Sequence, residues 1–400
     1  MRRLNLPPAV SLGLLSAIGL FAIDIYLPAL PLISTSLAAD SRLTQLSLTT
    51  FFVAMALCQV IYGPISDMFG RKRPLYVGLV VFIVGAVGCA LAPTIEWLIT
   101  FRFIQGAGAC AGLVTSRAVV RDLFTGPAAA ELMSRLMLVF SVSPIVAPLV
   151  GSIVIAVGDW RSIFYVMAAA ALIGLLIAAF ALDETRPAEK RAESSIASAF
   201  RAYGTLLRDP HYLGLVLVAS FGMSSYMIYV SNSSFVLIER YGLTPSTYSI
   251  VFSINAVAFI GMSQMNGFLS RRFGLTWVIK RAVVAFATVM VAHALARAIG
   301  FDSLPVMATF LFIGYGCLGL VVPSAAVLAL DGHGKIAGTA SALMGTVQFV
   351  TSAVVVGCGS LVFDGTSWPM VAIIACCAMA AATLALVTLR RHARVFAIGE

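Results

Sequence analysis

Long apolar stretches alternate with short polar ones along almost the whole chain. Each apolar run approaches or exceeds the roughly 20 residues that a helix needs to cross a bilayer. Transmembrane β-strands are shorter and alternate in polarity, which these runs do not. The pattern therefore predicts an all-α polytopic membrane protein with twelve transmembrane helices, at 10–33, 45–65, 74–93, 96–116, 132–157, 161–182, 211–234, 246–268, 275–299, 304–329, 337–362 and 368–389.

Composition agrees with the pattern. Hydrophobic residues make up 60% of the 400 positions and charged residues only 11%, against about 25% charged residues in a soluble domain. The seven cysteines all lie inside apolar runs and lack metal-ligand spacing, so we expect neither a disulfide framework nor a metal or cofactor site. A signal peptide is an alternative for the N-terminus, because Arg2 and Arg3 precede an apolar run and 36–38 resembles a cleavage site. However, the run is too long for one and contains Asp24, which favours a first span.

The charges fix an expected orientation. The net charge of +9 does not indicate nucleic acid, because the cations sit in short clusters between apolar runs. With a cytoplasmic N-terminus, the cytoplasmic segments carry 21 of the 26 Lys and Arg residues, so both termini are predicted to be cytoplasmic. The cytoplasmic cations are Arg2, Arg3, Arg71, Lys72, Arg73, Arg117, Arg121, Arg135, those of 183–210, Arg271, Arg272, Lys280, Arg281, Lys335, Arg390, Arg391 and Arg394; the outer ones are Arg42, Arg161, Arg240 and Arg297.

The longest polar segment divides the chain into two halves. We predict an N-terminal six-helix bundle over 1–182, a cytoplasmic linker over 183–210 and a C-terminal six-helix bundle over 211–400. An internal repeat supports two pseudo-symmetric bundles, since the GxxSxxFG pattern of 63–70 recurs at 267–274, 204 residues later. Such repeats place a substrate site between the halves near the midplane of the membrane.

Asp24 is the only carboxylate well inside an apolar run. An ionised acid there costs several kcal/mol, so it should face the protein interior or a water-filled cavity. Burial favours the neutral carboxyl group, which makes Asp24 a candidate proton carrier; a structural ion pair or a hydrogen-bonded helix contact is the alternative. Pro28 lacks the N–H that would bond the Asp24 carbonyl, so the helix should kink there, and Pro31 should bend or end it.

Arg102 is the second intramembrane charge. Its expected depth overlaps that of Asp24, which suggests a link between them, direct or through water. The alternative is that Arg102 snorkels outward or bonds nearby carbonyls. On the cytoplasmic side, Asp67 and Arg71 are four residues apart and can pair if that segment is helical; a plain positive loop is the alternative.

Other polar and small residues mark helix contacts or a substrate cavity. Pro144, Pro148 and Gly151 form one small, kinked stripe in the fifth span, which favours close packing and is compatible with gating. Polar and aromatic groups in the later spans suit an amphipathic cavity, although each is also a common helix–helix contact. These candidates are Tyr226, Tyr229, Asn232, Asn255 and Gln348.

Five motifs resemble those of the major facilitator superfamily. They are Gly63 to Arg73 between spans two and three, Leu98 to Gly108 in span four, Asp24 to Pro31 in span one, Ser143 to Gly151 in span five, and Gly338 to Gln348 in span eleven. Together they are most similar to the twelve-span drug:proton antiporters of the bicyclomycin and chloramphenicol resistance type. Two departures are Ser152, where a second glycine is common, and Arg271, where the first half has Asp67.

The resemblance implies drug:proton antiport by alternating access. It assigns Asp24 and Arg102 to coupling, and it adds Tyr26 and Gln105 to the candidate cavity residues. The assigned gating residues are Gly63, Asp67, Gly70, Arg71, Arg73, Pro144, Pro148 and Gly151.

The expected function is export of small amphipathic compounds such as antibiotics from a bacterial cell, by a monomer in the inner membrane. Its partners would be the substrate, protons and the lipid bilayer, with no nucleic acid. A proton-coupled transporter of a natural metabolite, such as a nucleoside or a sugar, is the main alternative. An intramembrane enzyme is disfavoured because the four histidines lie far apart, and a receptor because no sensory domain is evident.

Overall fold

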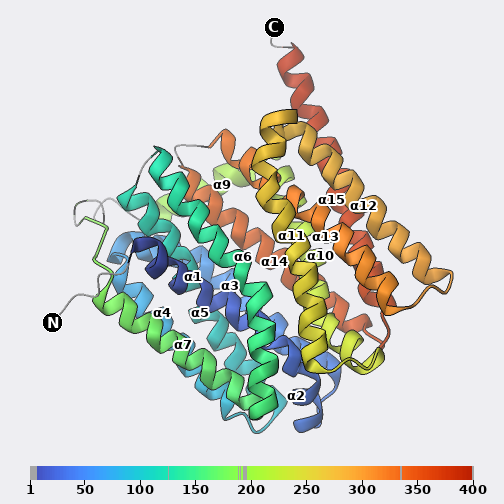
Figure 1. Ribbon diagram of the computed structural model, residues 1–400. Helices are drawn as coiled ribbons and strands as arrows, with labels where there is room; N and C mark the ends of the chain where they lie inside the picture. Colours follow the sequence, from blue (N-terminus) through green and yellow to red (C-terminus); the bar gives the residue numbers. More distant parts are fainter. Residues whose placement is uncertain are drawn as a thin grey trace. The chain divides into compact units, whose positions relative to one another are not determined.

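A computed structural model describes residues 7–124, 126–187, 189, 191, 196–333 and 336–398. The predicted cytoplasmic cations Arg2, Arg3 and Lys335 lie outside these residues. In the described part of the chain every regular element is a helix (Figure 1), which confirms the predicted all-α class.

The membrane spans follow the predicted apolar runs. Eleven helical stretches among the described residues are long and apolar enough to cross a membrane, and a shorter apolar helix, Val142–Val157, falls in the fifth run. The chain is therefore a multi-pass membrane protein, consistent with twelve transmembrane helices.

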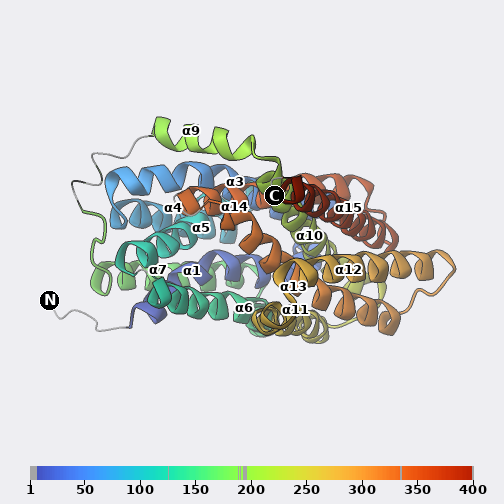
Figure 2. The ribbon, with the colours of Figure 1, turned by 90° about the horizontal axis from the view of Figure 1, so that it is seen from above.

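The helices form two compact units, Met1–Arg201 and Ala202–Glu400. In the first unit, α3 packs along α5, α5 packs on α4, and α4 also packs on α7 (Figure 2). The helix α1 contacts α5 and α6. The elements of this unit are α1 (Pro8–Asp24), η1 (Leu27–Ala29), α2 (Leu30–Ser36), α3 (Ser41–Phe69), α4 (Lys72–Ala90), α5 (Ile95–Leu123), α6 (Gly126–Val157) and α7 (Trp160–Phe180).

In the second unit, α10 packs against α13, α14 and α15, while α13 also contacts α11 and α12. The elements are α10 (Pro210–Ser234), η2 (Phe235–Arg240), α11 (Pro245–Phe273), α12 (Leu275–Ala298), α13 (Leu304–Asp331), α14 (Ala337–Val362) and α15 (Trp368–Ile398). The boundary between the units falls inside another helix, α9 (Ile196–Leu207), which lies in the segment predicted to be a linker.

The first span is broken at its acid. The helix α1 ends at Asp24, a 3₁₀ turn follows at Leu27–Ala29, and α2 resumes at Leu30. Pro28 sits in that turn and has no N–H to continue the helical ladder, so the predicted kink is confirmed. Pro31 was expected to bend or end the helix, and that part is wrong. It lies in the first turn of α2, which continues to Ser36, because proline is tolerated where no intrahelical N–H bond is needed.

Two glycines hold α5 tightly against its neighbours. A Cβ atom at Gly106 would lie 2.5 Å from the carbonyl oxygen of Phe51 in α3. One at Gly108 would lie 2.4 Å from the carbonyl oxygen of Gly78 in α4. The backbones therefore meet directly, and Arg102, one turn away on α5, is carried by a closely packed element.

Candidate functional site

Asp24 lies where α1 breaks and α6 passes. Its side chain is only 5% exposed. Ser143 of α6 lies near its carboxyl group, but the Ser143 hydroxyl group forms no hydrogen bond with the described residues. The break places the acid at a helix end, where backbone groups are not all used by the helix. A carboxyl group held this way is shielded from lipid.

The fifth-span stripe packs on the same break. A Cβ atom at Gly151 would lie 2.3 Å from the carbonyl oxygen of Ile25 and 3.0 Å from Cγ of Pro28. Pro144 and Pro148 both lie inside α6, and Pro148 is buried. The predicted close approach is thus made by Gly151 against the segment that follows Asp24, while the gating role of the stripe stays a prediction.

Arg102 is fully buried between two aromatic rings. Its guanidinium carbon lies 4.5 Å from the ring centroid of Tyr26 and 4.3 Å from that of Phe51. Its Nη1 donates to Oε1 of Gln105 at 2.7 Å and to the carbonyl oxygen of Ala22 at 3.4 Å. Cation–π contacts are strong when the cation is desolvated, so the rings stabilise a charge for which lipid offers no hydration.

No ion pair between Asp24 and Arg102 is among those that the described residues form. The direct form of the predicted link is therefore absent, and Arg102 instead bonds a nearby carbonyl, one of the alternatives. Its Nε and Nη2 are buried without a hydrogen-bond partner. A link through water stays a prediction.

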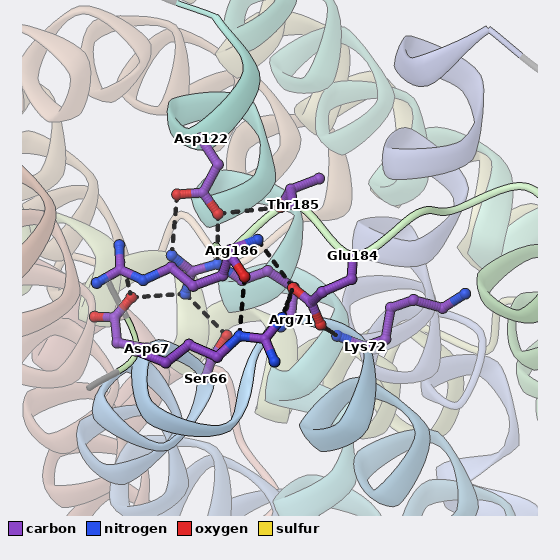
Figure 3. Close-up of polar contacts among 9 residues, drawn as sticks. Ser66, Asp67, Arg71, Lys72, Asp122, Glu184, Thr185 and Arg186 are labelled. Carbon is purple, nitrogen blue, oxygen red and sulfur yellow. Dashed lines mark hydrogen bonds and ion pairs between the residues drawn. The ribbon is translucent and has the colours of Figure 1, made fainter. Parts of the chain in front are cut away.

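Arg71 is the centre of a charged cluster at the end of α3 (Figure 3). Its guanidinium group pairs with Asp67 at 2.7 Å and with both carboxylate oxygens of Asp122, at 2.7 and 3.1 Å. It also donates to the hydroxyl group of Ser66 at 3.0 Å. The predicted pairing with Asp67 is confirmed. Arg71 is only 2% exposed, so it is packed rather than part of an open loop, and a role beyond setting the topology stays a prediction.

Glu184 completes this cluster from the segment after α7. Its carboxylate accepts hydrogen bonds from the backbone N–H groups of Arg71 at 2.9 Å and Lys72 at 3.2 Å, at the start of α4. Burial raises the pKa of Glu184, but these bonds and a third from the Arg186 N–H outweigh it, so the pKa lies below its usual value. Gly70 has φ +87°, a backbone conformation that favours glycine, and a Cβ atom there would displace the Glu184 carboxylate.

We call Ser66, Asp67, Arg71, Asp122 and Glu184 the Arg71 cluster. Sequence reasoning missed Asp122 and Glu184, although each lies just beyond an apolar run. Two other predicted gating residues are not part of the cluster: Arg73 is exposed, and a Cβ atom at Gly63 would meet nothing within 4 Å.

An aromatic group fills the interior of the second unit. The ring centroids of Tyr226 and Tyr229 are 6.4 Å apart, as expected for residues on one face, and Tyr315 lies 5.4 Å from each. Tyr229 stacks on Phe252 at 5.4 Å and accepts a hydrogen bond from Asn255 at 2.9 Å. Phe252 and Tyr315 were not predicted, since aromatic residues in apolar runs carry little signal of their own.

The remaining candidate cavity residues do not join this group. Asn232 donates to the carbonyl oxygen of Ile228 in its own helix at 2.9 Å, and Gln348 is half-buried in α14. Tyr26 and Gln105 belong to the surroundings of Arg102 in the first unit. A groove of about 240 Å³ lies between α1 and α7, but apolar residues alone line it, so it contains none of the candidates.

A fold of two six-helix units with these motifs defines a secondary transporter. The model of the Major Facilitator Superfamily matches residues 12–356. The chain is 38% identical to the MFS-type transporter YdgK of Bacillus subtilis over 87% of both chains. It is 31% identical to a bicyclomycin resistance protein homolog of Haemophilus influenzae over 88% of both. Other relatives are named as multidrug and chloramphenicol resistance proteins.

The chain belongs to the major facilitator superfamily, and its relatives support the drug:proton antiporter branch that the motifs indicated. The fold is shared with the xylose transporter XylE from E. coli, with a TM-score of 0.71 and 14% identity over 94% of this chain and 95% of that one.

Proposed function

We propose that this chain is a drug:proton antiporter that exports small amphipathic compounds, including antibiotics, from bacteria by alternating access. It would work as a monomer in the inner membrane, with both termini in the cytoplasm. The observation that carries the proposal is Asp24, a buried acid at a helix break onto which Gly151 of the fifth-span stripe packs. The resistance names of several relatives support the same reading.

In this mechanism Asp24 takes up and releases the coupled proton. A shift of α6 against the break would change the surroundings of the carboxyl group, and so couple its protonation to conformation. Arg102 supplies a fixed positive charge nearby, and the Arg71 cluster holds the cytoplasmic ends of the helices in one state. Each proton entering the cell yields about 2.3 kcal/mol per 100 mV of membrane potential.

The test measures drug resistance and proton movement in a variant whose residue 24 cannot be ionised. A drug-hypersensitive host expressing the protein should survive higher concentrations of several amphipathic antibiotics, and Asp24→Asn should abolish this protection. Asp40→Asn is the matched control, because Asp40 is an exposed N-cap of α3 and asparagine caps equally well. Full resistance of Asp24→Asn at equal protein level would contradict the assignment.

A metabolite transporter is separated from a drug exporter by which compound triggers proton release from the vesicles. In energised inside-out vesicles, whose lumen is acidic, an exported drug enters in exchange for protons and should raise the pH of the lumen. Proton release triggered by a nucleoside or a sugar, with no response to any drug in the panel, would instead favour the metabolite reading.

A further inference from the structure

The second unit repeats the α3–α4 turn without its carboxylates. The turn between α11 and α12 has the same pattern of residues and the same type of glycine, since Gly274 has φ +82° and Gly70 has φ +87°. Arg271 stands where the first repeat has Asp67. The helix α12 begins without a side-chain cap, whereas Glu184 accepts hydrogen bonds at the start of α4.

Four cations gather at this turn without an acidic partner. Arg271 and Arg272 lie in the last turn of α11, and Lys280 and Arg281 follow in α12. The sequence contains no Asp or Glu between Glu239 and Asp302. Among the described residues, no carboxylate forms an ion pair with any of the four.

The other acids described at this end of the second unit do not pair with them. Asp209, which caps α10, pairs with His333 at 3.2 Å. Asp331 ends α13 and is exposed, and no ion pair to it is among the described contacts. The charge of the turn is therefore open to a ligand from outside the chain.

Two exposed aromatic rings lie among these cations. Phe273 and Trp277 stack at 4.8 Å, and they are 46% and 47% exposed. The guanidinium group of Arg272 lies 5.4 Å from the Phe273 ring, and that of Arg281 lies 5.8 Å from the Trp277 ring. We call Arg271, Arg272, Phe273, Trp277, Lys280 and Arg281 the basic aromatic surface.

The position of this surface identifies its partner. It joins two membrane-spanning helices at the end of the unit where α15 extends towards the C-terminus (Figure 1). Aromatic rings favour the level of the lipid headgroups, and clustered Lys and Arg beside a span attract anionic lipids. Nucleic acid or an acidic protein could pair with the four cations, but either partner would leave the two exposed rings in water.

We propose that the basic aromatic surface binds the phosphate group of an anionic phospholipid, which supplies the negative charge that Asp67, Asp122 and Glu184 supply in the first unit. The rings lie beside the glycerol and the upper acyl chains, and the guanidinium groups above them hold the phosphate. With the orientation proposed above, the lipid belongs to the cytoplasmic leaflet. The binding itself needs neither proton coupling nor a particular substrate.

The experiment measures lipid binding directly. The full-length protein in detergent is titrated with phosphatidylglycerol or phosphatidylcholine, and bound lipid is counted by native mass spectrometry. Phosphatidylglycerol should bind more tightly. The double variant Arg272→Gln with Arg281→Gln should weaken it by about twenty-five-fold, at about fivefold for each charge removed near a membrane surface. Binding of phosphatidylcholine should stay within about twofold of the wild type.

The matched control is Arg208→Gln with Arg390→Gln, which removes the same charge from two exposed arginines at the same end of the unit. It should change phosphatidylglycerol binding by less than about threefold. An equal loss in both double variants would mean diffuse attraction to a basic end and would overturn the proposal, as would equal binding of the two lipids by the wild type. Because transport is not measured, either failure leaves the antiport proposal standing.

Discussion

A buried arginine without a carboxylate partner needs another source of stabilisation, and at Arg102 two aromatic rings provide it. A lysine in its place would keep the charge but lose the flat guanidinium group that lies against Tyr26 and Phe51. We expect Arg102→Lys to lower stability by about 2 kcal/mol or more and to reduce proton-coupled transport at least tenfold. Thermal unfolding in detergent and proteoliposome transport measure the two effects.

Arg161→Lys serves as the control for that substitution. Arg161 also lies over a ring, 4.2 Å from the centroid of Trp160, but its side chain is 34% exposed. Water competes for an exposed cation, so a loss of less than about 1 kcal/mol and normal transport are expected. Equal losses at both positions would show that burial between the rings is not what stabilises Arg102.

Asp302 gathers four side chains at the other end of the second unit. It accepts from Tyr241 at 2.6 Å and from Ser367 at 3.0 Å, and it pairs with Arg240 and Arg297. Burial raises its pKa, but the hydrogen bonds from Tyr241, Arg240 and Ser367 and the charge of Arg297 lower it further, to about 2. The sequence showed only an acid in a loop, because its partners come from three separate segments.

This network predicts how stability depends on pH. The pKa of Asp302 lies below its ordinary value of 3.8, so its ionised form stabilises the fold above about pH 4, and the contribution disappears as the pH falls towards 2. Wild type should therefore unfold at a higher temperature than Asp302→Asn at pH 6, with the gap closing at low pH. A gap of constant size between pH 6 and pH 2 would contradict the ionic origin.

At the scale of elements, the contact between α6 and the broken first span leaves no room for a side chain at residue 151. A methyl group at Gly151 would lie 2.3 Å from the Ile25 carbonyl oxygen, so Gly151→Ala must push α6 away from the break. We expect a loss of about 1–3 kcal/mol from overpacking and impaired drug resistance. Gly261→Ala in α11 is the control, because nothing lies within 4 Å of its new methyl group and alanine favours the helix. Impairment by Gly261→Ala alone would reverse this assignment.

The sequence was most informative where one residue type has one physical meaning. Pro28 lacks an N–H, so the break at Asp24 could be predicted from its position alone. By contrast, the guanidinium group of Arg71 pairs with Asp122, 51 residues away, and its backbone N–H donates to Glu184, 113 residues away. Nothing local connects such residues, and only the packing of α4, α5 and α7 brings them together. The rings around Arg102 were missed for the same reason.

At the scale of the whole molecule, the two repeats keep a shared turn and differ in charge. In the Arg71 cluster three carboxylates surround one buried arginine, whereas the basic aromatic surface presents its cations outward. Both repeats contribute to the asymmetry of Lys and Arg from which the orientation of the chain is predicted. The turn between α3 and α4 could be predicted only in part. The sequence repeat shows that both units contain the turn, but it does not show which acids from other segments contact it.

That asymmetry gives a prediction about topology. Because basic loops stay in the cytoplasm, green fluorescent protein fused after residue 398 should fluoresce, and alkaline phosphatase fused there should be inactive. The same phosphatase inserted between α12 and α13, next to Asp302, should be active, since it would lie outside.

A second test removes the charges on which this topology depends. The fusion pattern should weaken more when four cytoplasmic cations are replaced, Arg271, Arg272, Lys280 and Arg281, than when the four outer arginines are replaced. The reason is that cytoplasmic cations are the ones that keep a loop on the cytoplasmic side. An active phosphatase at the C-terminus and an inactive one next to Asp302 would show that the orientation is opposite to the predicted one. That result would also place the basic aromatic surface in the outer leaflet.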